Sequence, residues 1–260
     1  MTELKATGPE ATGPEALASA ALPVRHGFFT RRGGVSTGPY ASLNGSLSGG
    51  DDRAAVQANR DLVARSLGAG AMVGLTQVHG AAVVTVDQPW EAGAGPRADA
   101  MVTRRPRIAL GVITADCAPV LLADPAAGVI GAVHAGWRGA VAGVLEATVS
   151  AMAALGAEPA RIAATVGPCI RQPSYEVGAD LRDAVLAEGA DAARFFLDGA
   201  RPGRWQFDLA GYCALRLAGV GRVDIVPTDT GAEPERFFSH RRRTLAGGGP
   251  IGHQMSAIVL

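Results

Sequence analysis

Short apolar runs that alternate with amphipathic segments are the feature that most restricts the fold of this chain. Residues 107–114, 120–124 and 128–134 follow one another closely and have the length and β-branched content of buried strands. The next segment, residues 139–155, places its apolar side chains at helical spacing and is followed by Gly156, a helix-terminating residue. A chain that mixes buried strands and helices in this way is predicted to fold as an α/β protein.

The remaining elements complete one domain. Further strands are expected at residues 24–30, 161–167, 222–226 and 255–260, two short β-rich runs within residues 72–86, and helices at residues 52–68, 179–188 and 208–218. Because no linker separates these elements, we predict a single α/β domain with a mixed sheet over residues 24–260. Residues 1–23 contain the string ATGPE twice and are predicted to form a disordered, low-complexity tail.

Charge and composition exclude several classes of protein. The 24 Lys and Arg residues balance 24 Asp and Glu residues, which argues against a nucleic-acid-binding protein. No apolar run approaches the roughly 20 residues of a membrane helix, and acidic residues stand where a signal peptide carries positive charge. We therefore expect a cytoplasmic protein without membrane contact. The three cysteines form no CxxC pair and indicate free thiols or metal ligands.

Three side chains with metal-binding chemistry follow predicted strands. His79 lies in TQVHG, Cys117 in ITADC, and His134 ends the run GVIGAVH. Loops that follow strands at the rim of an α/β sheet are where sites gather. Two neutral imidazoles and one thiolate leave Zn²⁺ with a net positive charge and an open fourth position, as in catalytic zinc sites. Their wide spacing matches no zinc-finger pattern, so a structural role for each residue is the alternative.

A candidate anion site follows His134 directly. Trp137, Arg138 and Gly139 stand at the predicted start of a long helix, where free backbone N–H groups bind anions. Arg138 adds a guanidinium that binds phosphate through two parallel hydrogen bonds. A metal site and an anion site are thus expected at one rim of the sheet. Dinucleotide-binding and P-loop motifs are absent from the sequence.

Nine strings of the sequence resemble those of one bacterial family. They are HGFFTRRGGVS, SLNGS, TQVHG, ADAMVT, ITADCAPVLLAD, GAVHAGWRGAVAGV, VGPCI, SYEVG and ERFFSHRR, in this order. They resemble the laccase-domain family, also called polyphenol-oxidase-like proteins, over about residues 25–260. Members of that family are described as purine nucleoside phosphorylases with adenosine deaminase and methylthioadenosine phosphorylase activity. The resemblance implies a single α/β domain with mixed sheets packed between helices, and a metal held by His79, Cys117 and His134.

The same resemblance implies a zinc-dependent purine nucleoside phosphorylase. Adenosine, inosine or methylthioadenosine would react with phosphate to give the free base and a sugar 1-phosphate, with adenosine deamination as a linked activity. Zn²⁺ is the expected cofactor and Cu²⁺ the alternative, since both accept this ligand set. The metal and Arg138 are expected to hold phosphate. Asn44, Arg60 and Gln77 are expected to contact ribose or phosphate.

Three positions depart from the family pattern. Asp229 stands where members usually have Cys, His240 where they have Tyr, and His253 where they have Arg. These changes leave the three expected ligands intact and bear on substrate contacts near the C-terminus. Phosphorolysis also requires a general acid, for which Asp116 and Glu176 are the candidates.

Three other functions are open at this point. In a Cys–His amide hydrolase, for example in cell-wall precursor editing, Cys117 would be the nucleophile and His79 or His134 the base. A copper-dependent polyphenol oxidase would add Met101 or Met255 as a weak axial ligand, but five histidines cannot supply a multicopper cluster. A metal-dependent binding protein would hold a metal without turnover. Retention of activity after metal chelation would favour the hydrolase.

Overall fold

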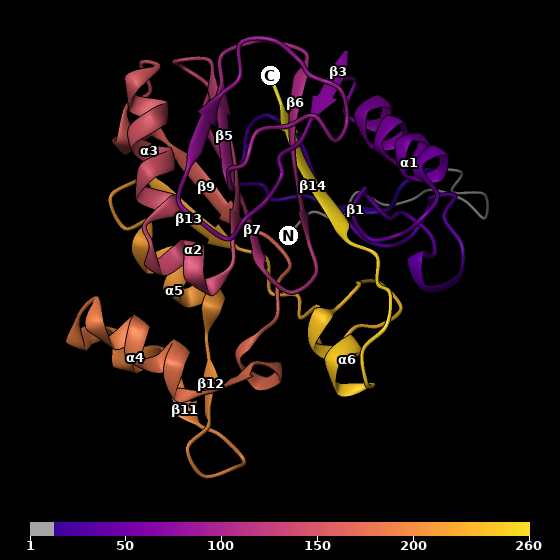
Figure 1. Cartoon of the computed structure of the whole chain (residues 1–260). Helices are drawn as coiled ribbons and strands as arrows, with labels where there is room; N and C mark the ends of the chain where they lie inside the picture. The colour runs from indigo at the N-terminus through magenta and orange to yellow at the C-terminus, as the bar shows by residue number, and fades with distance from the viewer. Residues whose placement is uncertain (1–12) are drawn as a thin grey trace.

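Two β-sheets packed face to face form the centre of the molecule (Figure 1). The computed structural model describes residues 13–260. The five-stranded sheet has the order β1-β2-β14-β6-β3, and the six-stranded sheet has the order β13-β9-β7-β8-β5-β4. Their strands are β1 (Ala16–Leu17), β2 (Arg25–Phe29), β3 (Ala71–Val73), β4 (Val83–Thr85), β5 (Ala100–Thr103), β6 (Ile108–Thr114), β7 (Ala118–Asp124), β8 (Val129–Ala135), β9 (Ala163–Val166), β13 (Arg222–Ile225) and β14 (Gln254–Val259). Each sheet combines parallel and antiparallel pairs.

Helices cover the outer faces of both sheets. On one side, α1 (Arg53–Ser66) packs against β3; on the other, α2 (Trp137–Val141), α3 (Val144–Ala154) and α5 (Leu209–Arg216) pack against the six-stranded sheet. Helix α1 begins where expected, because the Asp52 carboxylate accepts the N–H groups of Ala54 and Ala55. The predicted α/β domain with mixed sheets between helices is therefore confirmed. Among residues 13–260, no helix has the length and apolarity to cross a membrane.

Alternating side chains of the central strands fill the layers on both sides of each sheet. In β7, Val120 and Leu122 point toward the helices, whereas Leu121 packs between the two sheets. In β14, Val259 packs toward α1 and Ile258 packs between the sheets. Both faces of these strands are buried, which explains why they are continuous apolar runs in the sequence. The positions of the loops that follow the strands are fixed by this packing.

The helix expected over residues 139–155 is divided in two. Gly143 has a φ of +89° and separates α2 from α3, a left-handed conformation that glycine adopts without steric cost. The prediction of helical spacing was right, since Val144, Leu145 and Met152 are buried. The prediction of one long helix was wrong, because periodicity does not reveal a single left-handed residue. The anion site expected at the start of this helix would therefore lie at α2, which has five residues and carries Arg138 in its first turn.

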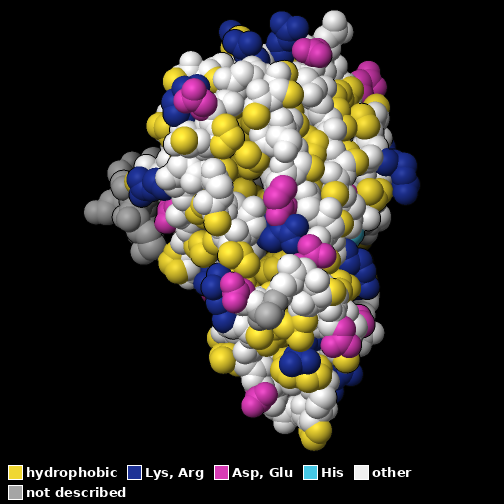
Figure 2. All heavy atoms as spheres, turned by 90° about the vertical axis from the view of Figure 1, so that its left-hand side faces the viewer, with side chains coloured by type: hydrophobic (Ala, Val, Ile, Leu, Met, Phe, Trp, Pro, Cys, Tyr) yellow, Lys and Arg dark blue, Asp and Glu magenta, His cyan; other side chains and the backbone are white. Residues whose placement is uncertain are grey.

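A small lobe projects below the layered body (Figures 1 and 2). It contains α4 (Ala179–Ala187) and the three-stranded sheet of β10 (Glu176–Val177), β11 (Phe196–Asp198) and β12 (Trp205–Phe207). The Phe207 ring contacts the Tyr212 ring of α5, with centroids 5.8 Å apart, and so joins the lobe to the main core. On the face shown in Figure 2, acidic and basic side chains are interspersed over both parts.

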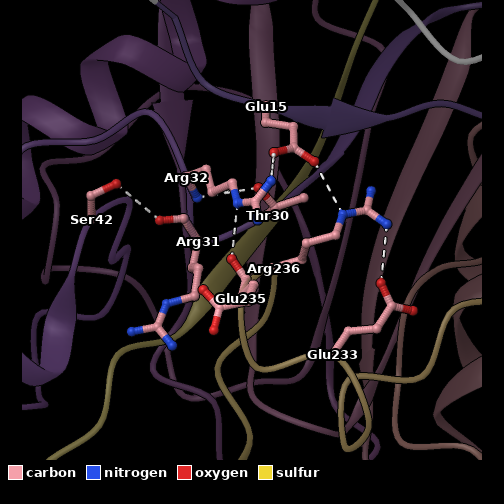
Figure 3. A network of polar contacts seen from close by, with 8 residues as sticks. All are labelled: Glu15, Thr30, Arg31, Arg32, Ser42, Glu233, Glu235 and Arg236. Atoms are coloured by element: carbon pink, nitrogen blue, oxygen red, sulfur yellow. Dashed lines mark hydrogen bonds and ion pairs between the residues drawn. The ribbon is translucent and has the colours of Figure 1, made fainter.

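The described chain starts upstream of the boundary expected at residue 24. Strand β1 pairs antiparallel with β2, and Glu15 forms ion pairs with Arg32 at 3.4 Å and Arg236 at 3.1 Å (Figure 3). Arg32 also donates to the carbonyl oxygen of Glu235 at 2.9 Å. Residues 13–23, expected to be disordered, thus belong to the fold, because β1 pairs with β2 and Glu15 forms an ion pair with the distant Arg236. Residues 1–12 of the predicted tail lie outside the described residues.

Two loops carry the chain from the five-stranded to the six-stranded sheet, and they bring His79 and Cys117 together. Residues 74–82 lead from β3 in the five-stranded sheet to β4 in the six-stranded sheet, and residues 115–117 lead from β6 to β7 in the same direction. These loops carry His79 and Cys117. Strand β8 pairs with β7 and carries His134 near its end, opposite Pro119. The topology therefore brings three distant residues to one rim of the double sheet.

Candidate metal centre

His79, Cys117 and His134 lie together, with all three donor atoms within 4.8 Å of one another. The Cys117 Sγ atom is 3.9 Å from His79 Nε2, and the two imidazole rings are 4.8 Å apart and nearly perpendicular. Within residues 13–260, they are the one group of three or more His, Cys, Asp or Glu side chains close enough to hold a metal ion. The structure thus unites the three residues that the sequence singled out.

The three donors and the space around them fit a tetrahedrally coordinated ion such as Zn²⁺. Zinc bonds to nitrogen and sulfur place neighbouring donors about 3.5 Å apart in a tetrahedral site, so donors that lie within 4.8 Å of one another need to close by about 1.3 Å at most. Gly136 borders the donors: a Cβ atom there would lie 2.9 Å from His79 Cδ2 and 3.0 Å from Cys117 Sγ. The glycine therefore leaves room beside the three donors that any other residue would fill.

Replacing Gly136 with alanine is expected to weaken metal binding by about tenfold or more, because the methyl group would push His79 and Cys117 apart. Competition with a chromogenic chelator would measure the affinity, and circular dichroism would verify folding. The matched control is Gly219→Ala, since a Cβ atom at Gly219 would meet nothing within 4 Å. An unchanged affinity in the Gly136 variant would contradict the placement of the metal between these donors.

Asp99 holds both histidines in place. Its buried carboxylate lies 2.8 Å from His134 Nδ1 and accepts the backbone N–H groups of Val78, His79 and Gly80 at 3.2, 2.9 and 2.7 Å. Three successive N–H groups directed at one acceptor require a tight turn, and His79 accordingly has a left-handed φ of 61°. A proton on His134 Nδ1, donated to Asp99, leaves Nε2 free to bind a metal.

Opposing electrostatic effects set the ionisation of the donors. Burial raises the pKa of Cys117, but the charge and hydrogen bonds of His134, together with those of His79, lower it to about 6. Burial lowers the pKa of His134, whereas Cys117 and Asp99 raise it to about 9. A thiolate beside an imidazolium is therefore favoured at neutral pH when no metal is bound. In contrast, burial raises the pKa of Cys169 to about 12, as expected of a neutral core thiol.

Asp116 fixes the loop that carries Cys117. With a left-handed φ of 90°, it accepts hydrogen bonds from Thr230 Oγ1 at 2.7 Å, Ser239 Oγ at 2.9 Å and the Arg241 N–H at 2.6 Å. These bonds tie the loop to α6 (His240–Leu245), a helix that sequence periodicity did not reveal. Because both of its oxygens are occupied, Asp116 is a structural acceptor and not the general acid for which it was a candidate.

A cavity of about 730 Å³ opens beside the three donors. Segments of both sheets contribute to it, together with α1, α2 and the C-terminal region. Four arginines line it: Arg53, Arg60, Arg138 and Arg241. Among the described residues, Asp116 is the one acidic side chain in the lining, and its hydrogen bonds are already made. The cavity is therefore positively charged and suited to an anionic ligand.

Of the four residues expected to contact phosphate or ribose, three line the cavity and one lies outside it. Arg60 and Arg138 line the cavity, and the Arg138 guanidinium lies 4.2 Å above the Trp137 ring. Gln77 also lines it, but the Gln77 amide is paired with the backbone of Ile113 at 2.8 and 2.9 Å. Asn44 is fully buried outside the lining, where its side chain binds the N–H groups of Ser46 and His253. Its observed contacts are those of a loop anchor.

Of the three positions that depart from the family pattern, two line the cavity and one does not. His240 and His253 line the cavity, and burial together with nearby positive groups lowers the pKa of His253 to about 4, so its ring is neutral. Asp229 caps a turn by accepting from Ser174 Oγ at 2.6 Å and the Gly231 N–H at 2.8 Å. Glu176, the other candidate acid, forms an ion pair with Arg201 away from the cavity.

The metal group, Asp99 and the cavity lie within the span of a known family. The family model described as multi-copper polyphenol oxidoreductase laccase matches residues 25–260. The chain belongs to this family. A crystal structure of Neisseria meningitidis protein NMB0706 has the same fold, with a TM-score of 0.84 and 37% identity over 94% of this chain and 97% of that one. The expected family and fold are confirmed.

Relatives of the chain have names of a different kind from that of the family model. Purine nucleoside phosphorylase ORF3 of Streptomyces griseus is 46% identical over 85% of this chain and 89% of its own length. Purine nucleoside phosphorylase of Deinococcus radiodurans is 44% identical over 87% of each chain. These names describe nucleoside cleavage, whereas the family model is named for copper oxidation.

Proposed function

We propose that this chain is a zinc-dependent purine nucleoside phosphorylase that acts on adenosine, inosine or methylthioadenosine and also deaminates adenosine. The observation that carries the proposal is the arginine-lined cavity that opens onto three metal donors. Phosphorolysis needs an oxyanion held beside a neutral nucleoside, and this cavity offers positive charge with no free carboxylate among its described lining. The names of the relatives from Streptomyces griseus and Deinococcus radiodurans support the same reaction.

The residues around the cavity have separate roles in this reaction. His79, Cys117 and His134 would hold the ion; when bound, it supplies positive charge to phosphate and can activate water for deamination. Asp99 orients His79 and His134, so the donors are positioned before the ion arrives. Arg138, stacked on Trp137, presents its guanidinium to phosphate. Arg60 and Gln77 are further candidate contacts to phosphate or ribose.

In the proposed reaction one bond forms and one bond breaks, and no oxidant or reductant is needed. A phosphate oxygen forms a bond to the ribose C1′ carbon while the C1′–N9 bond breaks, and the electron pair leaves with the purine. The purine then takes a proton from solvent, since Asp116 and Glu176 are committed to other partners. Positive charge that develops on the sugar is stabilised by the phosphate held beside it, so positioning supplies much of the rate.

The deciding experiment incubates metal-assayed protein with adenosine, with and without phosphate, and separates the products by chromatography. We expect adenine and ribose 1-phosphate only when phosphate is present, and inosine in either condition. Both activities should disappear after chelation and return with zinc. Absence of both adenine and inosine from metal-loaded protein would overturn the proposal and favour a metal-dependent binding protein or another substrate.

A Cys–His amide hydrolase is a second candidate because of one specific arrangement. Asp99, His134 and Cys117 are ordered like the acid, base and nucleophile of a catalytic triad, with 2.8 Å between the Asp99 carboxylate and His134 Nδ1. A metal-bound thiolate is a poor free nucleophile, so the two functions respond differently to chelation. Amide cleavage that survives chelation but is lost in Cys117→Ser would establish the hydrolase.

A copper-dependent polyphenol oxidase is less compatible with the site. Met101 and Met255, the two axial ligands considered, are fully buried and lie outside the cavity lining. The described residues hold one candidate metal group, whereas multicopper oxidation requires an electron-transfer copper and a separate copper cluster. We therefore propose nucleoside chemistry at this centre.

A further inference from the structure

Arg60 is a buried guanidinium that forms no ion pair within the described residues. It is 7% exposed and lies on the inner face of α1 beside Val56 and Val63. None of the ion pairs within residues 13–260 includes it, and its one hydrogen bond there runs from Nη1 to the Gly45 carbonyl oxygen at 3.3 Å. Burial lowers the pKa of Arg60, yet a guanidinium stays charged at neutral pH. An unpaired buried charge of this kind calls for an anionic partner.

Arg60 lines the cavity, and it also borders a second, smaller hollow beside Asp61 and Glu91. Gly74 lies against the guanidinium, since a Cβ atom there would come within 2.9 Å of Nη2 and 3.6 Å of Nη1. The glycine thus keeps this part of the guanidinium uncovered. Arg53, two turns earlier on α1, lines the same cavity, as do Ser46 and Ser48 of the loop that Arg60 contacts. Two guanidinium groups and two hydroxyl groups are the donors that an oxyanion requires.

Arg60 and Arg138 are carried by helices that pack against different sheets. Helix α1 packs against β3 of the five-stranded sheet, whereas α2 packs against β8, α3 and α5 on the other side of the double sheet (Figure 1). The electrostatic neighbours differ as well. Arg138 influences the pKa of Tyr175 together with Cys117 and Arg241, whereas Asp61 is the charged group that influences the pKa of Arg60. Arg60 and Arg138 therefore reach the cavity from different elements of the fold.

We propose that Arg60, with Arg53 and Ser46, forms a second oxyanion subsite that binds a phosphate group without the metal. This inference rests on the proposed function, because it assumes that the phosphate that attacks the sugar binds at Arg138. The ligand of the new subsite is a phosphate dianion, either free or carried as the 5′-phosphate of a purine nucleoside. In both cases its peripheral oxygens accept paired hydrogen bonds from the guanidinium. A cavity of about 730 Å³ has the size of sites that hold such ligands.

Calorimetry on the metal-stripped full chain tests the subsite with three probes: inorganic phosphate, adenosine and adenosine 5′-monophosphate. Saturable binding of inorganic phosphate would identify the free ion as the ligand. Tighter binding of the monophosphate than of adenosine, without binding of inorganic phosphate, would identify a phosphate carried by the substrate. In either case Arg60→Gln should weaken phosphate-dependent binding by about tenfold or more, through loss of charge-assisted hydrogen bonds. Arg138→Gln should weaken this binding clearly less than Arg60→Gln does.

Arg65→Gln is the matched control, because Arg65 is exposed on the same helix and lies outside the cavity lining. Should Arg60→Gln fail to fold, Arg53→Gln provides the second variant, since Arg53 is exposed and should show a smaller loss in the same direction. Absence of phosphate-dependent binding, or equal losses in the Arg60 and Arg138 variants, would overturn the subsite. Because no step requires metal or turnover, these results are independent of whether the chain performs phosphorolysis.

Discussion

Replacing Cys117 with serine is expected to remove the bound metal and to lower kcat/KM for phosphate-dependent adenosine cleavage by about a thousandfold. The thiolate is the one negatively charged donor of the three, and His134 with His79 holds its pKa near 6 despite burial. A serine hydroxyl does not ionise under the same conditions and is a weaker ligand. Elemental analysis of the purified variant would give the metal content, and steady-state kinetics would give the rate.

Cys213→Ala is the control for this prediction. Burial holds the pKa of Cys213 well above the usual value, and the residue is fully buried in α5. Its replacement should cost about 1–2 kcal/mol of stability, with one metal per chain and full activity retained. A Cys117→Ser variant that kept its metal and its rate would exclude Cys117 from the metal centre.

Asp99→Asn is expected to weaken metal binding by about 10- to 100-fold, a typical effect of removing a carboxylate that orients metal ligands. An amide has a single acceptor oxygen, so it cannot hold His134 Nδ1 and three backbone N–H groups together. The turn at His79 should loosen as well, because its left-handed backbone depends on those bonds. Metal titrations, followed by kinetics at increasing zinc concentration, would measure both effects.

Recovery of the rate at high zinc is the signature of a positioning role for Asp99. A hydrolase that uses Asp99, His134 and Cys117 as a triad would instead lose activity that zinc does not restore. Asp87→Asn provides the matched control, since Asp87 is an exposed carboxylate paired with Arg105. No change in metal affinity for Asp99→Asn would mean that the metal binds elsewhere.

Local patterns predicted the central part of the fold. Strands β6, β7 and β8 were foreseen because burial on both faces leaves a continuous apolar run. Strands β10, β11 and β12 were missed because each has only two or three residues and is defined by pairing with a partner that the sequence pattern does not mark. The break at Gly143 was missed for a related reason: helical periodicity continues across it.

The metal donors were predictable, but what supports them was not. His79 and Cys117 follow apolar strands and His134 lies near the end of one, so their chemistry stands out against such neighbours. The role of Asp99 depends on hydrogen bonds to residues 20 and 35 positions away, and no local pattern reports such contacts. The burial of Arg60 was equally hidden, because a charged residue in an amphipathic helix is expected to face solvent.

Two of the crossings between the sheets give a bound ion a mechanical role besides its chemical one. His79 and Cys117 lie on the loops where the chain passes from the five-stranded to the six-stranded sheet, and His134 lies on a strand of the second sheet. An ion held by all three cross-links the layers much as a disulfide would, and its binding energy adds to the free energy of unfolding. The supply of metal would then govern how long the protein survives heat or proteolysis as well as how fast it turns over.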